Sequence, residues 1–190
     1  MSVLREAAES YMSCLAAHGS RAPAQLLPGG APEDVRAHIE SVGLEPTDEL
    51  VEFFSWQGGM GGDSLTLGQL WIMPGFLPLS ITDAVQMYRL YADGPDWLPR
   101  WFPVFEDQAG WFYAYDLGEF RGAVVLFQHE TGQYPYVFES LAAMFSTHRA
   151  ALDRGAISVD SEGVLEQDYE RLSAVAKELN PKVPWWSLPE

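Results

Sequence analysis

The sequence predicts an α+β fold with N-terminal helices, a central antiparallel β-meander and C-terminal helices packed on the sheet. Apolar residues recur at helical spacing near both ends of the chain, which predicts amphipathic helices there. Three runs rich in strand formers, separated by turn residues, occupy residues 102–107, 111–116 and 122–129. Helices, then a meander, then helices are the order typical of an α+β architecture.

One domain accommodates most of this chain. The sequence has 190 residues, 47% of them hydrophobic, and its 7 Trp, 8 Tyr and 10 Phe can fill a large core. A domain of that size buries about 70% of the surface of its unfolded chain, so it needs no disulfide or metal. We expect a single domain over residues 1–180 and a C-terminal tail over residues 181–190.

The N-terminal part is expected to hold two helices joined by a loop. Residues 3–18 carry an apolar stripe that includes Tyr11 and predict the first helix. Gly and Pro punctuate residues 19–32, which predicts a loop. A second helix is expected to start near Pro32, because proline suits a first turn, and to end at Gly43.

Two more helices are predicted before the centre of the chain. In LEPTDELVEFFSWQGG, Pro46 and the acids after it suit a first helical turn, and Gly58 suits the C′ position. A loop or short strand is expected to follow. Ser80 and Asp83 then form a capping-box pattern, which predicts the start of another helix.

The remaining elements follow from alternation and spacing. Trp111, Tyr113 and Tyr115 are expected on one face of the second central strand, with Phe112 and Ala114 on the other. After the meander, the pattern predicts a helix over 140–154, a connector over 155–164 with room for a short strand, and a last helix over 165–179.

Charge is the strongest compositional signal. Twenty-seven acids face 11 bases, a formal net charge of −16. Phosphate backbones and anionic lipids repel such a protein, so we expect neither a nucleic-acid nor a membrane partner. A basic protein partner would be attracted, although acidity also serves solubility alone. Glu6 and Glu9 interrupt any signal-peptide segment, so the expected location is the cytoplasm.

No residue pattern predicts an enzyme. Cys14 and His18 lie four residues apart on one helix, but as the single cysteine and an isolated histidine they are interpreted as structural. The glycines of QGGMGGDS lack the Gly-Lys-Ser/Thr ending of a phosphate loop. We therefore expect no metal and no cofactor. The scattered His38, His129 and His148 are interpreted as core or surface residues.

Two acid pairs leave an alternative open. Glu106 with Asp107, and Asp116 with Glu119, flank strands that carry Trp and Tyr. Paired carboxylates beside aromatic rings would suit a small hydrolase or a carbohydrate-binding protein. The same acids are ordinary at hairpin ends, where they also suit contact with a cation or a basic partner.

The order of three segments resembles a known family. LEPTDELVEFFSWQGG, WFPVFEDQAGWFYAYDLG and FESLAAMFSTHRAAL are similar to the SUKH superfamily, particularly its Smi/Knr branch, over roughly residues 32–154. The matching positions are Pro46, Leu50, Phe53, Gly58, Gly59, Trp101, Pro103, Asp107, Gly110, Asp116, Phe138 and Leu141.

The resemblance implies a non-catalytic protein-binding module. We expect a monomer, because the sequence shows no obvious dimerisation seam. Bacterial members are immunity proteins that bind and neutralise a cognate toxin, often a nuclease, and fungal members are cell-wall regulators. A regulatory or adaptor protein is the alternative. An acidic inhibitor can be steered into the basic cleft of a nuclease. The residues expected to contact the partner are Asp63, Glu106, Asp107, Trp111, Asp116 and Glu119.

Overall fold

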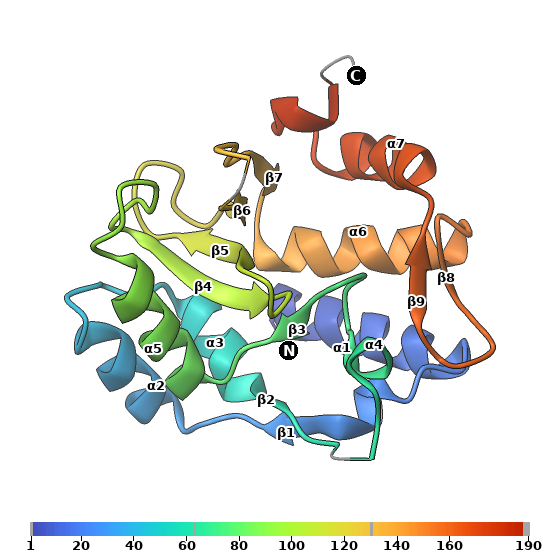
Figure 1. The fold of residues 1–190 in the computed structure, drawn as a ribbon, viewed down its shortest axis with the longest axis horizontal. Helices are drawn as coiled ribbons and strands as arrows, with labels where there is room; N and C mark the ends of the chain where they lie inside the picture. The colour runs from blue at the N-terminus through green and yellow to red at the C-terminus, as the bar shows by residue number, and fades with distance from the viewer. Residues whose placement is uncertain (1, 63, 130, 188–190) are drawn as a thin grey trace.

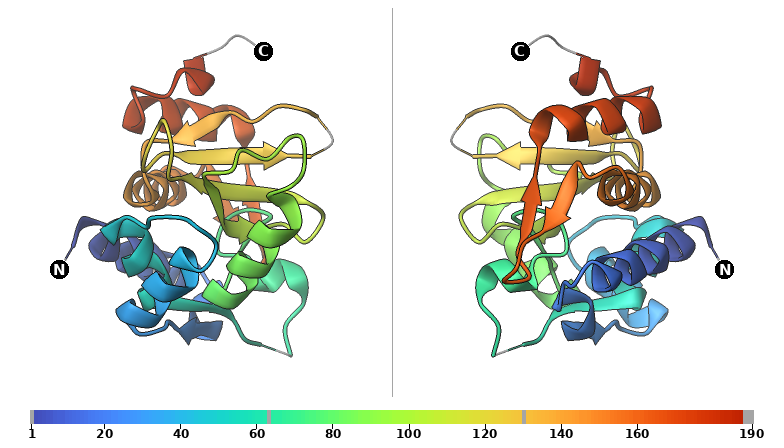
Figure 2. Two further views of the ribbon diagram at one scale, coloured as in Figure 1. Left: turned by 90° about the vertical axis from the view of Figure 1, so that its left-hand side faces the viewer. Right: turned by 90° about the vertical axis from the view of Figure 1, so that its right-hand side faces the viewer.

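The computed structural model describes residues 2–62, 64–129 and 131–187, and it confirms the α+β class. At its centre lies one antiparallel sheet with the strand order β3-β4-β5-β6-β7 (Figure 1). Helices α2 and α5 lie below and to the left of the sheet in that view, and α7 lies above it (Figures 1 and 2). None of the described helices combines the length and the apolar character that crossing a membrane requires.

The N-terminal helices begin at residues that the sequence marks as caps. Helix α1 (Val3–Ala17) is capped by Ser2, α2 (Pro32–Glu40) begins at its proline, and α3 (Asp48–Trp56) is capped by Thr47. The predicted loop over 19–32 is only partly a loop. It contains the 3-10 helix η1 (Ala22–Gln25) and the strand β1 (Leu26–Pro28). A strand of three residues is too short to show a period, so the pattern could not indicate it.

Gly58 follows the end of α3 as predicted, but for a different reason. The chain does not turn there; it continues directly into strand β2 (Gln57–Met60), which pairs antiparallel with β1. A Cβ atom on Gly58 would lie 2.3 Å from the carbonyl oxygen of Pro28. The glycine is therefore needed for close contact between the two strands.

The predicted meander is present, with an additional short strand at each edge. The three expected strands are β4 (Trp101–Glu106), β5 (Trp111–Asp116) and β6 (Val124–Gln128). Strand β3 (Leu77–Pro78) pairs with β4, and β7 (Tyr136–Phe138) pairs with β6. Short helix α4 (Leu67–Leu70) precedes β3, and α5 (Ile81–Tyr91) follows it with Ser80 as its N-cap, as the capping box predicted.

Both faces of the sheet are covered by aromatic side chains. On one face, Phe112 contacts Tyr91 of α5, with their ring centroids 5.0 Å apart. On the other face, Tyr113 contacts Phe105, which in turn packs against Phe53 of α3 at 5.4 Å. The alternation predicted for this strand is therefore confirmed, and the sheet is the centre of the core.

The C-terminal part differs from the prediction at one helix start. Helix α6 (Leu141–Asp153) lies alongside α1 and matches the expected span. The last helix, α7 (Tyr169–Leu179), begins four residues later than predicted, because Asp168 caps its first turn. Residues before that cap form β9 (Leu165–Gln167), which pairs with β8 (Ile157–Val159). Helix α7 packs on α6, and the tail continues into η2 (Pro184–Ser187).

Candidate functional site

A pocket of about 360 Å³ lies where β2 and β3 approach the last residue of β4. Its lining includes residues 58–60 of β2, residues 77–79, and Asp83 from the first turn of α5. Glu106, one of the six residues expected to contact a partner, lies in this pocket together with Asp83. We call it the acidic pocket.

The buried side chain of Gln57 holds two walls of the acidic pocket together. Its amide nitrogen donates a hydrogen bond to the carbonyl oxygen of Leu79 at 2.9 Å, and its amide oxygen accepts from the N–H of Gly59 at 2.6 Å. Gly59 has a φ of +89°, and a Cβ atom there would approach the main-chain nitrogen of Ser80 to 3.2 Å. The pocket is thus built on fixed backbone rather than on flexible loops.

Glu106 is the chemically distinctive group of the acidic pocket. Its side chain is half-buried and forms no hydrogen bond or ion pair with the described residues. Burial raises the pKa of the Glu106 carboxyl, and the nearby carboxylates of Asp83 and Asp107 raise it further. A positive group entering the pocket would relieve both effects, so the pocket suits a cation.

The turn after β4 forms another part of the pocket rim. Gln108 has a φ of +62° and is the single non-glycine residue with a positive φ in the described ranges. Asp107 fixes this turn, because one of its carboxylate oxygens accepts hydrogen bonds from the N–H groups of Ala109 at 2.7 Å and Trp111 at 2.9 Å. A left-handed residue beside a pocket is a feature that often accompanies function.

The other expected contact residues do not gather in the acidic pocket. In the β4–β5 pairing, Glu106 lies opposite Phe112, whereas Asp116 lies opposite Trp101. Five residue steps along β4 separate the two ends by about 17 Å. Glu106, Asp107 and Trp111 therefore lie at one end of the hairpin, and Asp116 and Glu119 follow the other end.

Asp116 is buried, with 2% of its surface exposed. Its carboxylate accepts hydrogen bonds from the N–H groups of Gly118 and Phe120 and from the hydroxyl of Tyr136 at 2.7 Å. Asp116 thus stabilises the turn after β5 through its hydrogen bonds, while Glu119 is exposed on that turn. Trp111 is half-buried against the core. Asp63 lies outside the described residues.

The two acid pairs do not form the arrangement that a glycosidase requires. Paired catalytic carboxylates lie within about 10 Å of each other across the sugar. The pairs here are at opposite ends of the hairpin, and Asp116 is fully hydrogen-bonded. Within the described ranges, no group of three or more His, Cys, Asp or Glu side chains is placed to hold a metal ion.

Cys14 and His18 do meet, as their spacing predicted. The thiol sulfur lies 3.5 Å from Nδ1 of His18, and that nitrogen also lies 2.9 Å from the carbonyl oxygen of Cys14. Burial raises the pKa of the Cys14 thiol, which favours the unreactive thiol form. The pair is therefore better explained as the end of α1 than as a nucleophile with its base.

Sequence reasoning missed Asp83 and Gln108 as parts of the acidic pocket. Asp83 was recognised only as a capping residue, and its side chain does accept a hydrogen bond from the hydroxyl of Ser80 at 2.6 Å. It is brought near Glu106 because β3, which ends five residues before it, pairs with the end of β4. No local pattern carries that information.

Fold and site together define an α+β domain with one acidic pocket and no converging catalytic groups among the described residues. The chain belongs to the SMI1 / KNR4 family (SUKH-1), whose model matches residues 29–147 of the 190. The match runs from just before α2 into α6 and confirms the resemblance seen in the sequence. Among curated proteins, none is similar enough to count as a match.

Proposed function

We propose that this protein is a non-catalytic protein-binding module that receives a basic side chain of its partner in the acidic pocket. The observation that carries the proposal is Glu106, a half-buried carboxyl group with a raised pKa and with Asp83 beside it. A guanidinium group fits such a site best, because it remains charged and donates several hydrogen bonds in a fixed plane.

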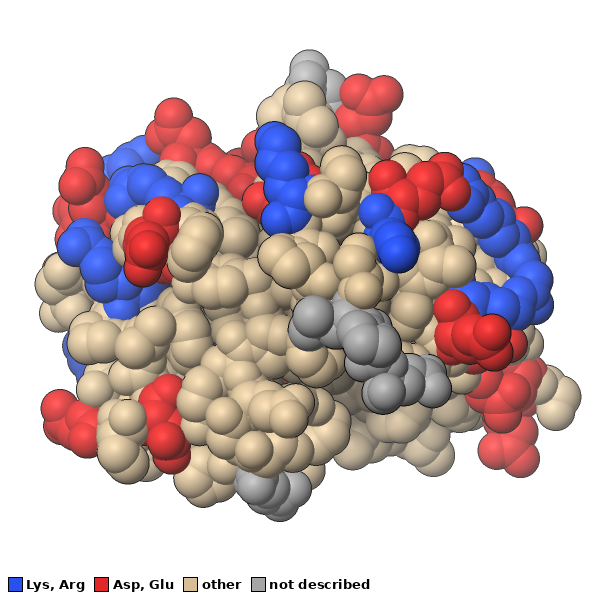
Figure 3. Space-filling view, turned by 90° about the horizontal axis from the view of Figure 1, so that it is seen from above, with Lys and Arg blue, Asp and Glu red and all other residues tan. Residues whose placement is uncertain are grey.

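The charge of the whole chain supports a basic partner. A net charge of −16 speeds the encounter with a positively charged protein and slows it with an acidic one. However, the face seen in Figure 3 carries Lys and Arg side chains next to Asp and Glu, with a broad uncharged area between them. Recognition on that face therefore needs discrete sites rather than one continuous acidic field.

Family membership is consistent with an immunity protein or a cell-wall-related protein. We favour the immunity function, in which the partner is a basic toxin such as a nuclease. An acidic protein that inserts Glu106 and its neighbours around a basic side chain could block a positively charged substrate cleft. A regulatory or adaptor protein would use the same pocket on a different partner.

The proposal is tested with the tagged protein and with lysate and secreted fraction of the source organism. We expect recovery of one basic protein, with less recovered as the salt concentration rises. Glu106→Gln should weaken this binding at least tenfold in calorimetry. Glu33→Gln, which removes an equal charge from an exposed residue of α2, should change it less than twofold. An acidic partner, or equal effects of the two substitutions, would contradict the proposal.

A further inference from the structure

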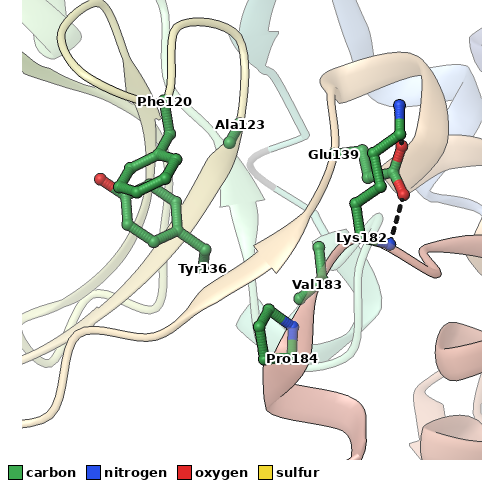
Figure 4. Close-up of a pocket in the computed structure, with 7 residues that line it drawn as sticks. All are labelled: Phe120, Ala123, Tyr136, Glu139, Lys182, Val183 and Pro184. Atoms are coloured by element: carbon green, nitrogen blue, oxygen red, sulfur yellow. Dashed lines mark hydrogen bonds and ion pairs between the residues drawn. The ribbon is translucent and has the colours of Figure 1, made fainter.

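A second cavity lies at the opposite end of the β4–β5 hairpin from the acidic pocket. It is a groove of about 410 Å³ between the turn after β5, strand β7 and the C-terminal segment. Its size falls within the range of about 300–1,000 Å³ that is typical of ligand pockets. The apolar residues that line this groove are Phe120, Ala123, Tyr136, Val183 and Pro184 (Figure 4).

The aromatic wall of the groove is fixed by Asp116. The hydroxyl of Tyr136 donates to the Asp116 carboxylate at 2.7 Å, and the N–H of Phe120 donates to the same carboxylate at 3.1 Å. The two rings lie with their centroids 4.5 Å apart. Phe120 is therefore held in place although 53% of its surface is exposed. Aromatic residues, Phe among them, are enriched at protein interfaces relative to the rest of the surface.

The opposite wall is also fixed. Asn180, which is fully buried, accepts a hydrogen bond from the N–H of Glu139 at 3.1 Å. The Glu139 carboxylate in turn accepts from the N–H of Lys182 at 2.9 Å (dashed line in Figure 4). Beyond the groove, the indole N–H of Trp186 donates to the carbonyl oxygen of Val137 at 2.6 Å. These three bonds anchor the end of α7 and the C-terminal segment to β7 and to Glu139, the residue that follows it.

One preorganised charge remains at the groove. The Glu139 side chain is 25% exposed and is held by the main chain of Lys182. The ammonium group of Lys182 lies 3.6 Å from the Glu139 carboxylate, but this side chain is 85% exposed and so is held only weakly. The Tyr136 hydroxyl proton is already given to Asp116, so that ring offers no free donor to the carbonyl groups of a proline-rich peptide.

We propose that this groove binds a hydrophobic side chain of the partner that is followed by a lysine or arginine. The apolar side chain fills the space between Phe120, Tyr136 and Val183. The basic side chain replaces Lys182 on the fixed carboxylate of Glu139, in agreement with the net negative charge of the chain. The inference rests on the proposed function, since it adds a second contact for the same kind of basic protein partner.

The first test uses the ¹⁵N-labelled protein and short peptides as probes. We expect acetyl-Phe-Arg-amide to shift the amide signals of residues 120–123, 136–139 and 182–183, with a dissociation constant of about 1 mM. Acetyl-Ala-Arg-amide and acetyl-Phe-Glu-amide should bind at least fivefold more weakly. The proposal would be overturned if acetyl-Phe-Arg-amide, at about ten times the expected dissociation constant, shifts no amide signals at the groove. Equal binding of the three peptides would also overturn it.

Variants separate the two contributions. Glu139→Gln keeps the acceptor for the Lys182 N–H but should remove the preference for arginine. Ala123→Leu fills the groove and should abolish binding; because it could disturb the turn, Phe120→Ala serves as a second groove variant. Leu90→Ala removes a side chain that is 69% exposed on α5, outside the groove lining, and should leave binding unchanged. An equal loss of binding in Leu90→Ala would show that the peptide binds surface apolar groups unselectively.

The groove proposal and the proposed function can be contradicted independently of each other. If Ala123→Leu and Phe120→Ala leave the affinity for the captured partner unchanged while Glu106→Gln weakens it, the groove proposal is wrong and the proposed function stands. If Glu106→Gln has no effect while the groove variants and Glu139→Gln weaken binding, the partner does not bind in the acidic pocket. That result would contradict the proposed function and support the groove proposal.

Discussion

The Glu49 carboxylate accepts a hydrogen bond at 3.1 Å from the main-chain N–H of Ala142, so the start of α3 caps the start of α6. The second carboxylate oxygen of Glu49 accepts from the hydroxyl of Tyr115 on the sheet, also at 3.1 Å. One side chain thus joins two helices and the central strand. The first turn of α6 also has its own cap in Ser140, so Glu49 supplies a second acceptor for the same helix end.

Removal of this carboxylate should lower stability measurably. Burial raises the pKa of Glu49, but the hydrogen bonds from Ala142 and Tyr115 favour its ionised form. We expect Glu49→Ala to lower the free energy of unfolding by about 2 kcal/mol, because a helix cap and a side-chain hydrogen bond are both lost. Urea denaturation at pH 7 measures this. Glu45→Ala, at an exposed position just before α3, is the control, and a loss of equal size there would refute the explanation.

His148 should make the protein less stable in mild acid. Its side chain is 2% exposed, and burial lowers its pKa to about 4. Between pH 4 and the ordinary histidine pKa of about 6.5, the unfolded chain binds a proton that the folded chain does not. The free energy of unfolding should therefore fall as the pH falls through this range, by about 2 kcal/mol between pH 7 and pH 5.

A matched pair of variants isolates this effect. His38 has the same local geometry as His148, with Nδ1 at 2.7 Å from the carbonyl oxygen four residues earlier, but it is exposed on α2. In His148→Leu, most of the decrease in the free energy of unfolding between pH 7 and pH 5 should be absent. In His38→Leu, the decrease should be the same as in the unsubstituted protein. An unchanged pH dependence in His148→Leu would mean that other groups cause the acid sensitivity.

The elements that could be predicted are those with local signals. Ser80 and Asp83 lie three residues apart, and the alternation of Phe112 with Tyr113 is visible within one strand, so helix α5 and strand β5 were both found. Strands β1 and β9 have three residues each, which is too few for a period to appear. The acidic pocket could not be predicted from the sequence for another reason. Asp83 and Glu106 are brought together only by the pairing of β3 with β4.

Glu106 and Asp107 are adjacent acids with opposite expected effects on stability. The folded-state pKa of Glu106 is raised, so above its ordinary pKa the folded chain holds this proton more strongly than the unfolded chain does. Ionisation of Glu106 therefore opposes folding as the pH rises. We expect Glu106→Gln to increase the free energy of unfolding at pH 7 and to have little effect at pH 4.

The same denaturation series tests Asp107. Its carboxylate accepts two main-chain hydrogen bonds in the turn after β4, from Ala109 and Trp111. Asp107→Ala should lower the free energy of unfolding by about 1–2 kcal/mol, because both donors lose their acceptor. Equal destabilisation by Glu106→Gln would mean that Glu106 is also a structural residue of the turn, and the acidic pocket would lose its unpaired carboxyl group.

Asp116 looked like an exposed turn residue in the sequence, but its burial depends on Tyr136, twenty positions later, whose hydroxyl completes its hydrogen bonds. If this carboxylate holds the turn, Asp116→Ala should lower the free energy of unfolding by about 3 kcal/mol, since three donors lose their acceptor. Glu119→Ala, exposed on the same turn, should change it by less than about 0.5 kcal/mol. Urea denaturation distinguishes the two roles, because replacing a residue that only forms a surface contact would not lower the free energy of unfolding.

Tyr136→Phe should lower the free energy of unfolding by about 1 kcal/mol, because one hydrogen bond to Asp116 is lost. It should also broaden the NMR signals of Phe120, since one of the groups that fix the aromatic wall of the groove is removed.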